Sequence, residues 1–307
     1  MELEEVYSRF HEIKGLVFSR QRGRSIRFGD HKSRFRGAGY DFAAIEQWRP
    51  GETLTGVSWK LSLKNYPDKI FRIRRIEPKE MPVDLVIDIS SSMRFQILKG
   101  ANKGRLLFEL IGLLGFTGIS RQDPVGAVGF SEGIEFFLRP KASRGQIFHI
   151  AKKAFERMQM SQLDENQSGP SDFNLPLRLI YRKFKFRHVV FVISDFVDAI
   201  NNPELIDYDN LKRLSSRHHV IAIVLHDPEE FNWGRAKGVV LARNPETRRL
   251  RPIKASRAAW IRENIAEKKA AMITKFKECG VEAVELAYED YFEKLTGFFA
   301  GKNNVFS

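Results

Sequence analysis

The sequence predicts an α/β fold with a mostly parallel sheet, and three features of the chain lead to this prediction. From about residue 82 onward, apolar runs of strand length alternate with helical patterns, as in a parallel sheet covered by helices. Two apolar runs within 125–140 flank Glu132-Gly133, which predicts a hairpin and hence one antiparallel edge strand. Short segments punctuated by Pro and Gly before residue 82 predict a small β-rich region.

The first domain is predicted to cover residues 1–81 and to contain an N-terminal helix and the small β-rich region. Apolar residues recur at helical spacing over 2–19, which indicates an amphipathic helix. Within 37–80 the clearest half-buried strand is KIFRIRRI, residues 69–76, because its apolar and basic residues alternate.

The second domain, 82–307, is predicted to supply further strands and the helices that cover them. Continuous apolar runs indicate strands buried on both faces, and they span 83–90, 188–195 and 219–227, while 281–287 predicts a last short strand. Helical spacing of apolar residues predicts helices over 96–119, 146–158, 172–184, 256–278 and 291–299. Ligands of such sheets bind at the carboxyl ends of the strands, so functional residues are expected there.

The composition excludes several classes of protein. The chain has 307 residues, 43% hydrophobic and 29% charged, which is the balance of a globular protein. Its single cysteine, Cys279, allows neither an intramolecular disulfide nor a cysteine-based zinc site. The N-terminus lacks the pattern of a signal peptide and no apolar run reaches the length of a membrane span, so a cytoplasmic location is expected.

The net charge of +13 is unevenly distributed along the chain. Lys and Arg outnumber acids by seven to one over 20–36, six to one over 243–257 and five to none over 178–187. Such stretches form solvated basic faces or meet phosphates, acidic membranes and acidic proteins. A basic nucleic-acid-binding protein is therefore one hypothesis for the function, although few aromatic residues interleave with the first stretch.

Oxygen-bearing side chains follow the first two buried strands. Asp88, Ser90 and Ser92 alternate at the end of the first strand, and Asp195 ends the second. Alternate residues of an extended chain share one side, so the carboxylate and the two hydroxyls can converge. Ser171, in the loop before a later helix, adds another hydroxyl. Such hard oxygen donors suit Mg²⁺ or Mn²⁺, and a metal would offset the cost of burying Asp88.

Other interpretations of DLVIDISSSM, residues 84–93, stay open. A haloacid-dehalogenase-type phosphotransferase needs a second acid two residues after its nucleophile, and Ser90 stands there instead. A serine nucleophile on a sharp turn needs a flanking glycine, and none flanks Ser90 to Ser92. Asp88 could also serve only as a local hydrogen-bond acceptor. A Mg²⁺-dependent phosphohydrolase remains the enzymatic alternative.

Asp-x-Ser-x-Ser at residues 88–92 resembles the metal-ion-dependent adhesion site (MIDAS) of von Willebrand factor type A domains. That family adds a Thr from a loop before a helix, and SGPSDFNLPL places Ser171 there with its hydroxyl retained. Its third element, an Asp after a later strand, is matched in FVISDFVD. The resemblance implies a doubly wound, mostly parallel sheet. It also implies Mg²⁺ or Mn²⁺ held by Asp88, Ser90, Ser92, Ser171 and, directly or through water, Asp195.

The region before this motif resembles the bacterial "domain of unknown function 58" family. That family typically carries Gly-x-Gly-x-Asp/Glu-Phe, a Pro-Gly pair and Trp-Lys-x-Ser, which this chain keeps as Gly37, Gly39, Asp41, Phe42, Pro50, Gly51, Trp59, Lys60 and Ser62. The chain departs from the pattern at Trp48, Glu52-Thr53, Ser58 and Lys64. The resemblance covers residues 15–300.

This resemblance implies interaction rather than catalysis. Members of the family often accompany MoxR-type AAA ATPases, which implies a joint role in chaperone-like assembly. In type A domains the metal keeps an open coordination position that a carboxylate of the partner fills. A chain with a net charge of +13 would also steer an acidic partner towards itself. The expected function is therefore a metal-dependent protein-interaction module and not an enzyme.

Overall fold

The computed structural model describes most of the chain. The described residues are Glu4, Tyr7, His11 and the ranges 41–49, 57–65, 69–76, 81–94, 103–163, 169–227, 238–243 and 250–303. They belong to two compact units, one formed by Met1–Arg27 with Met81–Ser307 and the other by Phe28–Glu80. Glu4, Tyr7 and His11 therefore group with the α/β unit, whereas the predicted division places them in a first domain, 1–81.

Little of the predicted N-terminal helix over 2–19 can be compared with the structure. Glu4, Tyr7 and His11 are helical, and the rings of Tyr7 and His11 lie 5.5 and 5.6 Å from that of Phe148. The other residues of 2–19 and the arginine-rich stretch 20–36 lie outside the described residues.

The unit Phe28–Glu80 contains a two-stranded antiparallel sheet. β1 (Asp41–Gln47) pairs with β2 (Phe71–Ile76), with a register shift between Phe42 and Ala44. β2 is the strand predicted at 69–76 from its alternation of apolar and basic residues.

The sequence predicts a β-rich region over 37–80, and the structure adds helix α2 (Trp59–Asn65), which lies between the two strands along the chain. The hydroxyl of Ser62 joins this helix to β2. It accepts a hydrogen bond from the Phe71 N–H at 2.8 Å and donates to the Ser58 carbonyl at 2.9 Å. Trp59, the first residue of this helix, is 55% exposed.

The α/β unit is built on a six-stranded sheet with the order β10-β7-β6-β3-β4-β5. Neighbouring strands are parallel except for β4 and β5, which form the predicted hairpin. The mostly parallel α/β sheet with an antiparallel edge strand is thereby confirmed. Its strands are β3 (Val83–Asp88), β4 (Val125–Phe130), β5 (Ile134–Lys141), β6 (Val189–Ser194), β7 (His219–Leu225) and β10 (Glu282–Leu286).

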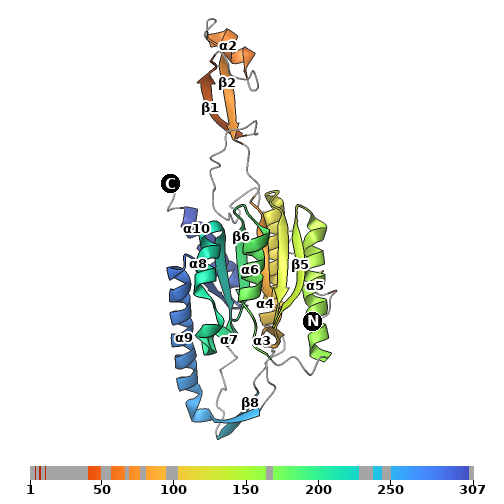
Figure 1. The fold of residues 1–307 in the computed structure, drawn as a ribbon, viewed down its shortest axis with the longest axis vertical. Helices are drawn as coiled ribbons and strands as arrows, with labels where there is room; N and C mark the ends of the chain where they lie inside the picture. Colours follow the sequence, from red (N-terminus) through yellow and green to blue (C-terminus); the bar gives the residue numbers. More distant parts are fainter. Residues whose placement is uncertain are drawn as a thin grey trace. The chain divides into compact units, whose positions relative to one another are not determined.

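Helices cover both faces of this sheet (Figure 1). One face carries α4 (Lys103–Ser120), α5 (Arg144–Leu163) and α10 (Tyr291–Asn303). The other carries α6 (Asn174–Lys183), α7 (Val197–Asn201), α8 (Tyr208–Arg217) and α9 (Ala258–Glu278). Among the described residues, no helix is both long and apolar enough to cross a membrane.

Several short elements connect these parts. Helix α3 (Ser91–Arg94) follows β3 directly, and the first described residue of the helix predicted at 96–119 is Lys103. The 3-10 helix η2 (Pro203–Leu205) lies between α7 and α8. A small hairpin of β8 (Val239–Arg243) and β9 (Leu250–Lys254) and the 3-10 turn η3 (Ala255–Arg257) precede α9.

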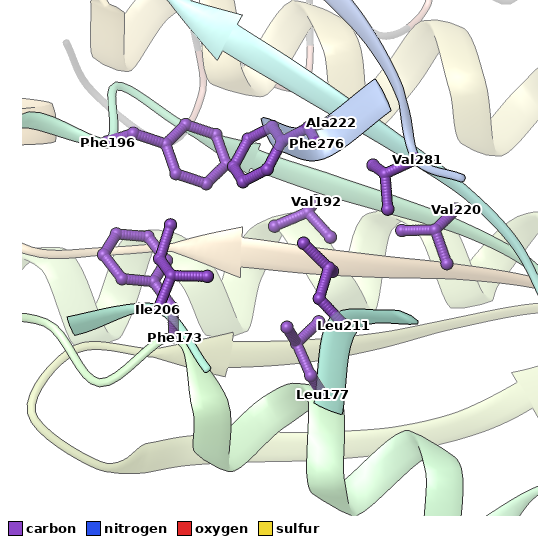
Figure 2. Close-up of a pocket in the computed structure, with 10 residues that line it drawn as sticks. All are labelled: Phe173, Leu177, Val192, Phe196, Ile206, Leu211, Val220, Ala222, Phe276 and Val281. Atoms are coloured by element: carbon purple, nitrogen blue, oxygen red, sulfur yellow. The ribbon is translucent and has the colours of Figure 1, made fainter. Parts of the chain in front are cut away.

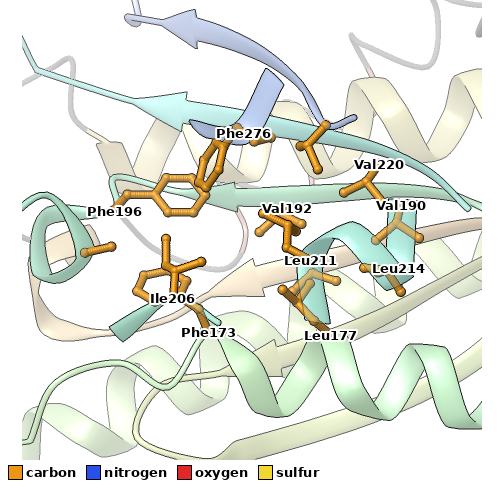
Figure 3. Close-up of a cluster of buried hydrophobic side chains, with 14 of the residues drawn as sticks. Phe173, Leu177, Val190, Val192, Phe196, Ile206, Leu211, Leu214, Val220 and Phe276 are labelled. Atoms are coloured by element: carbon orange, nitrogen blue, oxygen red, sulfur yellow. The ribbon is translucent and has the colours of Figure 1, made fainter. Parts of the chain in front are cut away.

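The central strands are buried on both faces, which explains their continuous apolar sequences. All six residues of β3, β4 and β6 are buried. On one face, Val190 and Val192 pack with Leu211 of α8 and Phe276 of α9 (Figure 3). Val86 belongs to the same cluster. Burial of this kind contributes roughly 1.5–3 kcal/mol for each large aliphatic or aromatic side chain.

A buried acid also lies at the N-terminal end of the strands. Asp84 is 0% exposed, and its Oδ2 is 2.5 Å from Nδ1 of His188. The His188 N–H donates to Nδ1 of His218 at 3.2 Å. Burial raises the pKa of Asp84, although the contact with His188 opposes the shift. Burial, with the positive charges of His188, Arg217 and Arg187, lowers the pKa of His218 to about 4.

This cluster predicts a loss of stability in mild acid that depends on His218. The unfolded chain binds a proton at His218 near pH 6.5, whereas the folded protein does so only near pH 4. The free energy of unfolding should therefore fall as the pH drops through this window, by at most about 1.4 kcal/mol per pH unit. His218→Asn keeps an acceptor for the His188 N–H and lacks the titrating ring, so it should lose less.

Urea denaturation of both proteins at several pH values between neutrality and about pH 4 measures this difference. Every titrating group except His218 is present in both proteins, so the difference between them reports on His218. A stability difference between the two proteins that stays constant over this range would contradict the prediction.

Candidate functional site

The carboxyl ends of β3 and β6 bring four of the five predicted site residues into one cluster. The Ser90 and Ser92 hydroxyl oxygens are 3.0 Å apart, and the Ser92 hydroxyl donates to Oδ1 of Asp195 at 3.2 Å. Oδ1 of Asp88 accepts from the Ser90 N–H at 2.9 Å. β3 and β6 are parallel neighbours, so residues that follow them meet although they are far apart in sequence.

Ser171, the fifth predicted residue, lies beside this cluster and is 3% exposed. Its backbone N–H donates to Oδ2 of Asp198 at 3.0 Å, so the loop before α6 is tied to the segment after β6. Within the described part of the chain, no hydrogen bond joins the Ser171 hydroxyl to the other four residues.

Ser194, at the end of β6, is a member of the cluster that the predicted set did not include. Its hydroxyl donates to Oδ2 of Asp88 at 2.6 Å and accepts from the Phe196 N–H at 2.8 Å. Both oxygens of Asp88 are therefore hydrogen-bonded. Ser194 directly precedes Asp195, the acid of the motif, and this position at the end of the strand is the signal in the sequence.

Lys103, the first residue of α4, is the second residue that the prediction missed. Its Nζ lies 2.7 Å from Oδ2 of Asp195, and the side chains are 1% and 3% exposed. The sequence held one signal for it. Lysines are almost never fully buried unless they are paired, so a lysine within a helix as buried as α4 needs a carboxylate partner.

The loop after β6 holds Asp195 through a strained backbone. Phe196 has a φ of 53°, a left-handed conformation that costs a residue with a side chain about 1–2 kcal/mol. Its ring stacks on that of Phe173 at 5.2 Å and meets Phe276 of α9 at 5.4 Å. The loops that carry Asp195 and Ser171 are thus joined through the aromatic residues that follow each of them.

A small cavity lies among these rings, and Figure 2 shows the side chains that line it. It offers about 20 Å³ of space, and every lining residue is apolar, including Phe173, Phe196 and Phe276. This space is near the minimum for one water molecule, which would find no polar partner there. The cavity is therefore a packing void beneath the site and not a ligand pocket.

The acids of the cluster repel each other at a buried site. Burial first, and the charge of Asp195 second, raise the pKa of Asp88 to about 7, against the hydrogen bonds from Ser194 and Ser90. Burial also raises the pKa of Asp198, where the Ser171 N–H opposes the shift and Asp195 supports it. A bound cation would relieve this repulsion, so the charge of the site fits a cation.

The donor set is also suited to a hard cation. Within the described ranges, no three His, Cys, Asp or Glu side chains are grouped so as to hold a metal. The cluster instead combines the carboxylates of Asp88 and Asp195 with the hydroxyls of Ser90, Ser92 and Ser194. Such mixed oxygen donors fit Mg²⁺ or Mn²⁺, whose coordination shells are usually completed by water.

A model of the family described as "Protein of unknown function DUF58" matches residues 45–274 of the chain. The chain belongs to this family. No curated protein matches this DUF58 chain.

Two solved structures are similar to the DUF58 chain over most of their length. The conserved hypothetical protein BatB from Bacteroides thetaiotaomicron has 14% identity and a TM-score of 0.41, covering 73% of this chain and 99% of its own. An uncharacterized membrane spanning protein from Vibrio fischeri has 10% identity and a TM-score of 0.25, covering 75% and 100%. TM-scores this low do not establish a common fold.

The position of Ser194 predicts that its hydroxyl stabilises the folded protein. Ser194→Ala should lower the free energy of unfolding by about 1–3 kcal/mol, because a buried carboxylate oxygen and a buried N–H both lose their partner. Chemical denaturation measures this loss. Ser216→Ala, which removes an exposed hydroxyl bonded to the Arg213 carbonyl, is the control and should change stability by less than about 0.5 kcal/mol. Equal effects of both substitutions would contradict the assignment.

Proposed function

We propose that this DUF58 protein binds Mg²⁺ or Mn²⁺ at the carboxyl end of its sheet and, through the metal, an acidic residue of a protein partner. The observation that carries the proposal is the hydrogen-bonded cluster of Asp88, Ser90, Ser92 and Asp195. These four side chains would hold the ion, with Ser171 beside them.

The chemistry of these residues supports a binding role. Asp88 and Asp195 supply negative charge, whereas Ser90 and Ser92 supply neutral hydroxyl oxygens. A divalent ion held by few carboxylates keeps positive charge in excess, and when bound it offers an open coordination position to a carboxylate. The neutral serine hydroxyls do not offset the positive charge of the ion, so the bound ion would still attract a carboxylate.

The identity of the partner is proposed from the motif and the family. Asp-x-Ser-x-Ser with a downstream Asp supports a type A-like adhesion site, and the family resemblance supports a MoxR-type AAA ATPase as the partner. The net charge of +13 favours an acidic surface as the docking site. The proposed role is thus that of a non-enzymatic adaptor in chaperone-like assembly.

The proposal predicts that Mg²⁺ stabilises the protein through Asp88. In wild-type protein, an excess of about 100 times the dissociation constant should add about 2.7 kcal/mol to the free energy of unfolding. Asp88→Asn should lose most of this gain, because it removes one of two anionic ligands, and it should weaken Mg²⁺-dependent capture of a MoxR-type ATPase. Calorimetric titration and thermal unfolding with Mg²⁺ or a chelator measure these effects.

Asp84→Asn is the matched control for this experiment. Asp84 is also a buried acid of β3, and it lies near the start of this strand, whereas Asp88 ends it. Its substitution should lower stability without changing the response to Mg²⁺. Absence of Mg²⁺ and Mn²⁺ binding to the wild-type protein would disprove the proposed site.

The opposite end of the sheet favours a second candidate function, nucleic-acid binding. Phe186 in the loop between α6 and β6 is 75% exposed. Four cations surround it in sequence, Arg182, Lys183, Lys185 and Arg187, and none pairs with an acid in the described part of the chain. Exposed aromatic rings among unpaired cations suit stacking on bases and contact with phosphates.

This second candidate predicts binding of a single-stranded oligonucleotide that weakens steeply with salt, because cations that contact phosphates release counterions. Phe186→Ala should weaken binding by about 1–3 kcal/mol if the ring stacks on a base. Met160→Ala, at a side chain that is 58% exposed on α5, is the control. Fluorescence anisotropy at several salt concentrations measures both, and an affinity that does not depend on salt would exclude this function.

A further inference from the structure

Lys103 is buried at a place where a lysine is costly. It is the first described residue of α4, a helix that is buried along most of its length. Its side chain is 1% exposed, and lysines are almost never this buried unless they are paired. The carboxylate of Asp195, 2.7 Å from Nζ, provides the pairing charge.

The ammonium group lies within the oxygen cluster that is proposed to hold a divalent ion. Its partner Asp195 accepts from Ser92 through the other carboxylate oxygen, and Ser92 is in turn 3.0 Å from Ser90. An ammonium and a divalent ion on the same carboxylate would repel each other strongly, because buried charges are poorly screened. Lys103 and the metal therefore compete for Asp195.

We propose that Lys103 is an internal competitor of the divalent ion, which closes the site when no metal is bound and leaves Asp195 when metal binds. The inference rests on the proposed metal-dependent function. The flexible four-carbon stem allows the ammonium to move while α4 keeps its place in the core. The apparent metal affinity is then the intrinsic affinity multiplied by the fraction of molecules in which Lys103 is released.

Competition of this kind would also restrict access to the partner. In the closed arrangement the four cluster residues are each at most 5% exposed: Asp88, Ser90, Ser92 and Asp195. A carboxylate of another protein therefore cannot reach the position of the ion. Metal binding and release of Lys103 would open the site together. The lysine thereby links the acceptance of an acidic partner to the concentration of the metal.

The test compares metal binding by the wild-type chain and by Lys103→Met, which keeps the length of the side chain and removes its charge. Calorimetric titration with MgCl₂ and MnCl₂ should show binding to Lys103→Met at least about tenfold tighter than to wild type. Mg²⁺ should also raise the unfolding temperature of this variant more than that of wild type, because the ion replaces the lost counter-charge of Asp195.

Glu109→Gln is the matched control, since Glu109 is a buried charge on the same helix. It is 2% exposed and accepts hydrogen bonds from Tyr288 at 3.2 Å and Tyr291 at 2.5 Å. Its substitution should lower stability, and Mg²⁺ should not restore it beyond the effect on wild type.

The outcomes separate the inference from the function on which it rests. Equal or weaker binding by Lys103→Met, with clear binding by wild type, overturns the competition and leaves the metal site standing. Binding by the variant alone supports the competition and overturns metal-dependent function in the native chain. Absence of binding by both proteins overturns both proposals.

A measurement on the wild-type chain keeps the inference testable if Lys103→Met does not fold. Acetic anhydride modifies exposed lysines, and peptide mass spectrometry reports the extent at Lys103. Mg²⁺ should increase acetylation of Lys103 several-fold and leave that of exposed lysines such as Lys152 and Lys277 unchanged. Mg²⁺ binding without any change at Lys103 overturns the proposal.

Discussion

The negative charge of Asp88 and Asp195, buried at the ends of two neighbouring strands, is the constraint on which this end of the molecule depends. Each charge is met by groups from different elements: the Ser90 N–H and the Ser194 hydroxyl for Asp88, the Ser92 hydroxyl and the Lys103 ammonium for Asp195. Contacts with these two buried carboxylates therefore hold α3, α4 and the loop after β6 together. The left-handed backbone of Phe196 is stabilised by the same hydroxyl of Ser194.

The parallel sheet places several exposed basic residues of the α/β unit at one end. Helices that return against parallel strands begin near the carboxyl ends of the strands and end near their amino ends. Basic residues in the last turns of α6, α8 and α9 thus gather at the amino ends, where they are favoured by the helix dipoles. The acids of the candidate site gather at the opposite end. This distribution supports the proposed binding of anionic ligands at the amino ends and of a cation at the carboxyl ends.

Burial of the cluster means that any ligand competes with bonds that already exist. The closed arrangement satisfies both oxygens of Asp88 and both oxygens of Asp195, so a cation binds only by the difference between its own contacts and these. Such a site responds to ligand concentration through a change in arrangement. The rings of Phe173 and Phe196 stack beneath the cluster, so a movement of the loop before α6 would also displace the loop after β6.

The sequence by itself determined the sheet, its antiparallel edge and the meeting of Asp88, Ser90, Ser92 and Asp195. The sheet follows from continuous apolar runs of strand length. The meeting of the four residues follows from the motif and from the rule that parallel strands share one carboxyl edge. Only the tertiary structure decided that Lys103 reaches Asp195, that Ser194 holds Asp88 and that Ser171 lies beside the cluster through Asp198. Helix α2 belongs with these, because Ser62 docks it on a strand nine residues away. Such contacts depend on which helix or loop packs on which strand. The spacing of apolar residues along the chain does not predict this packing.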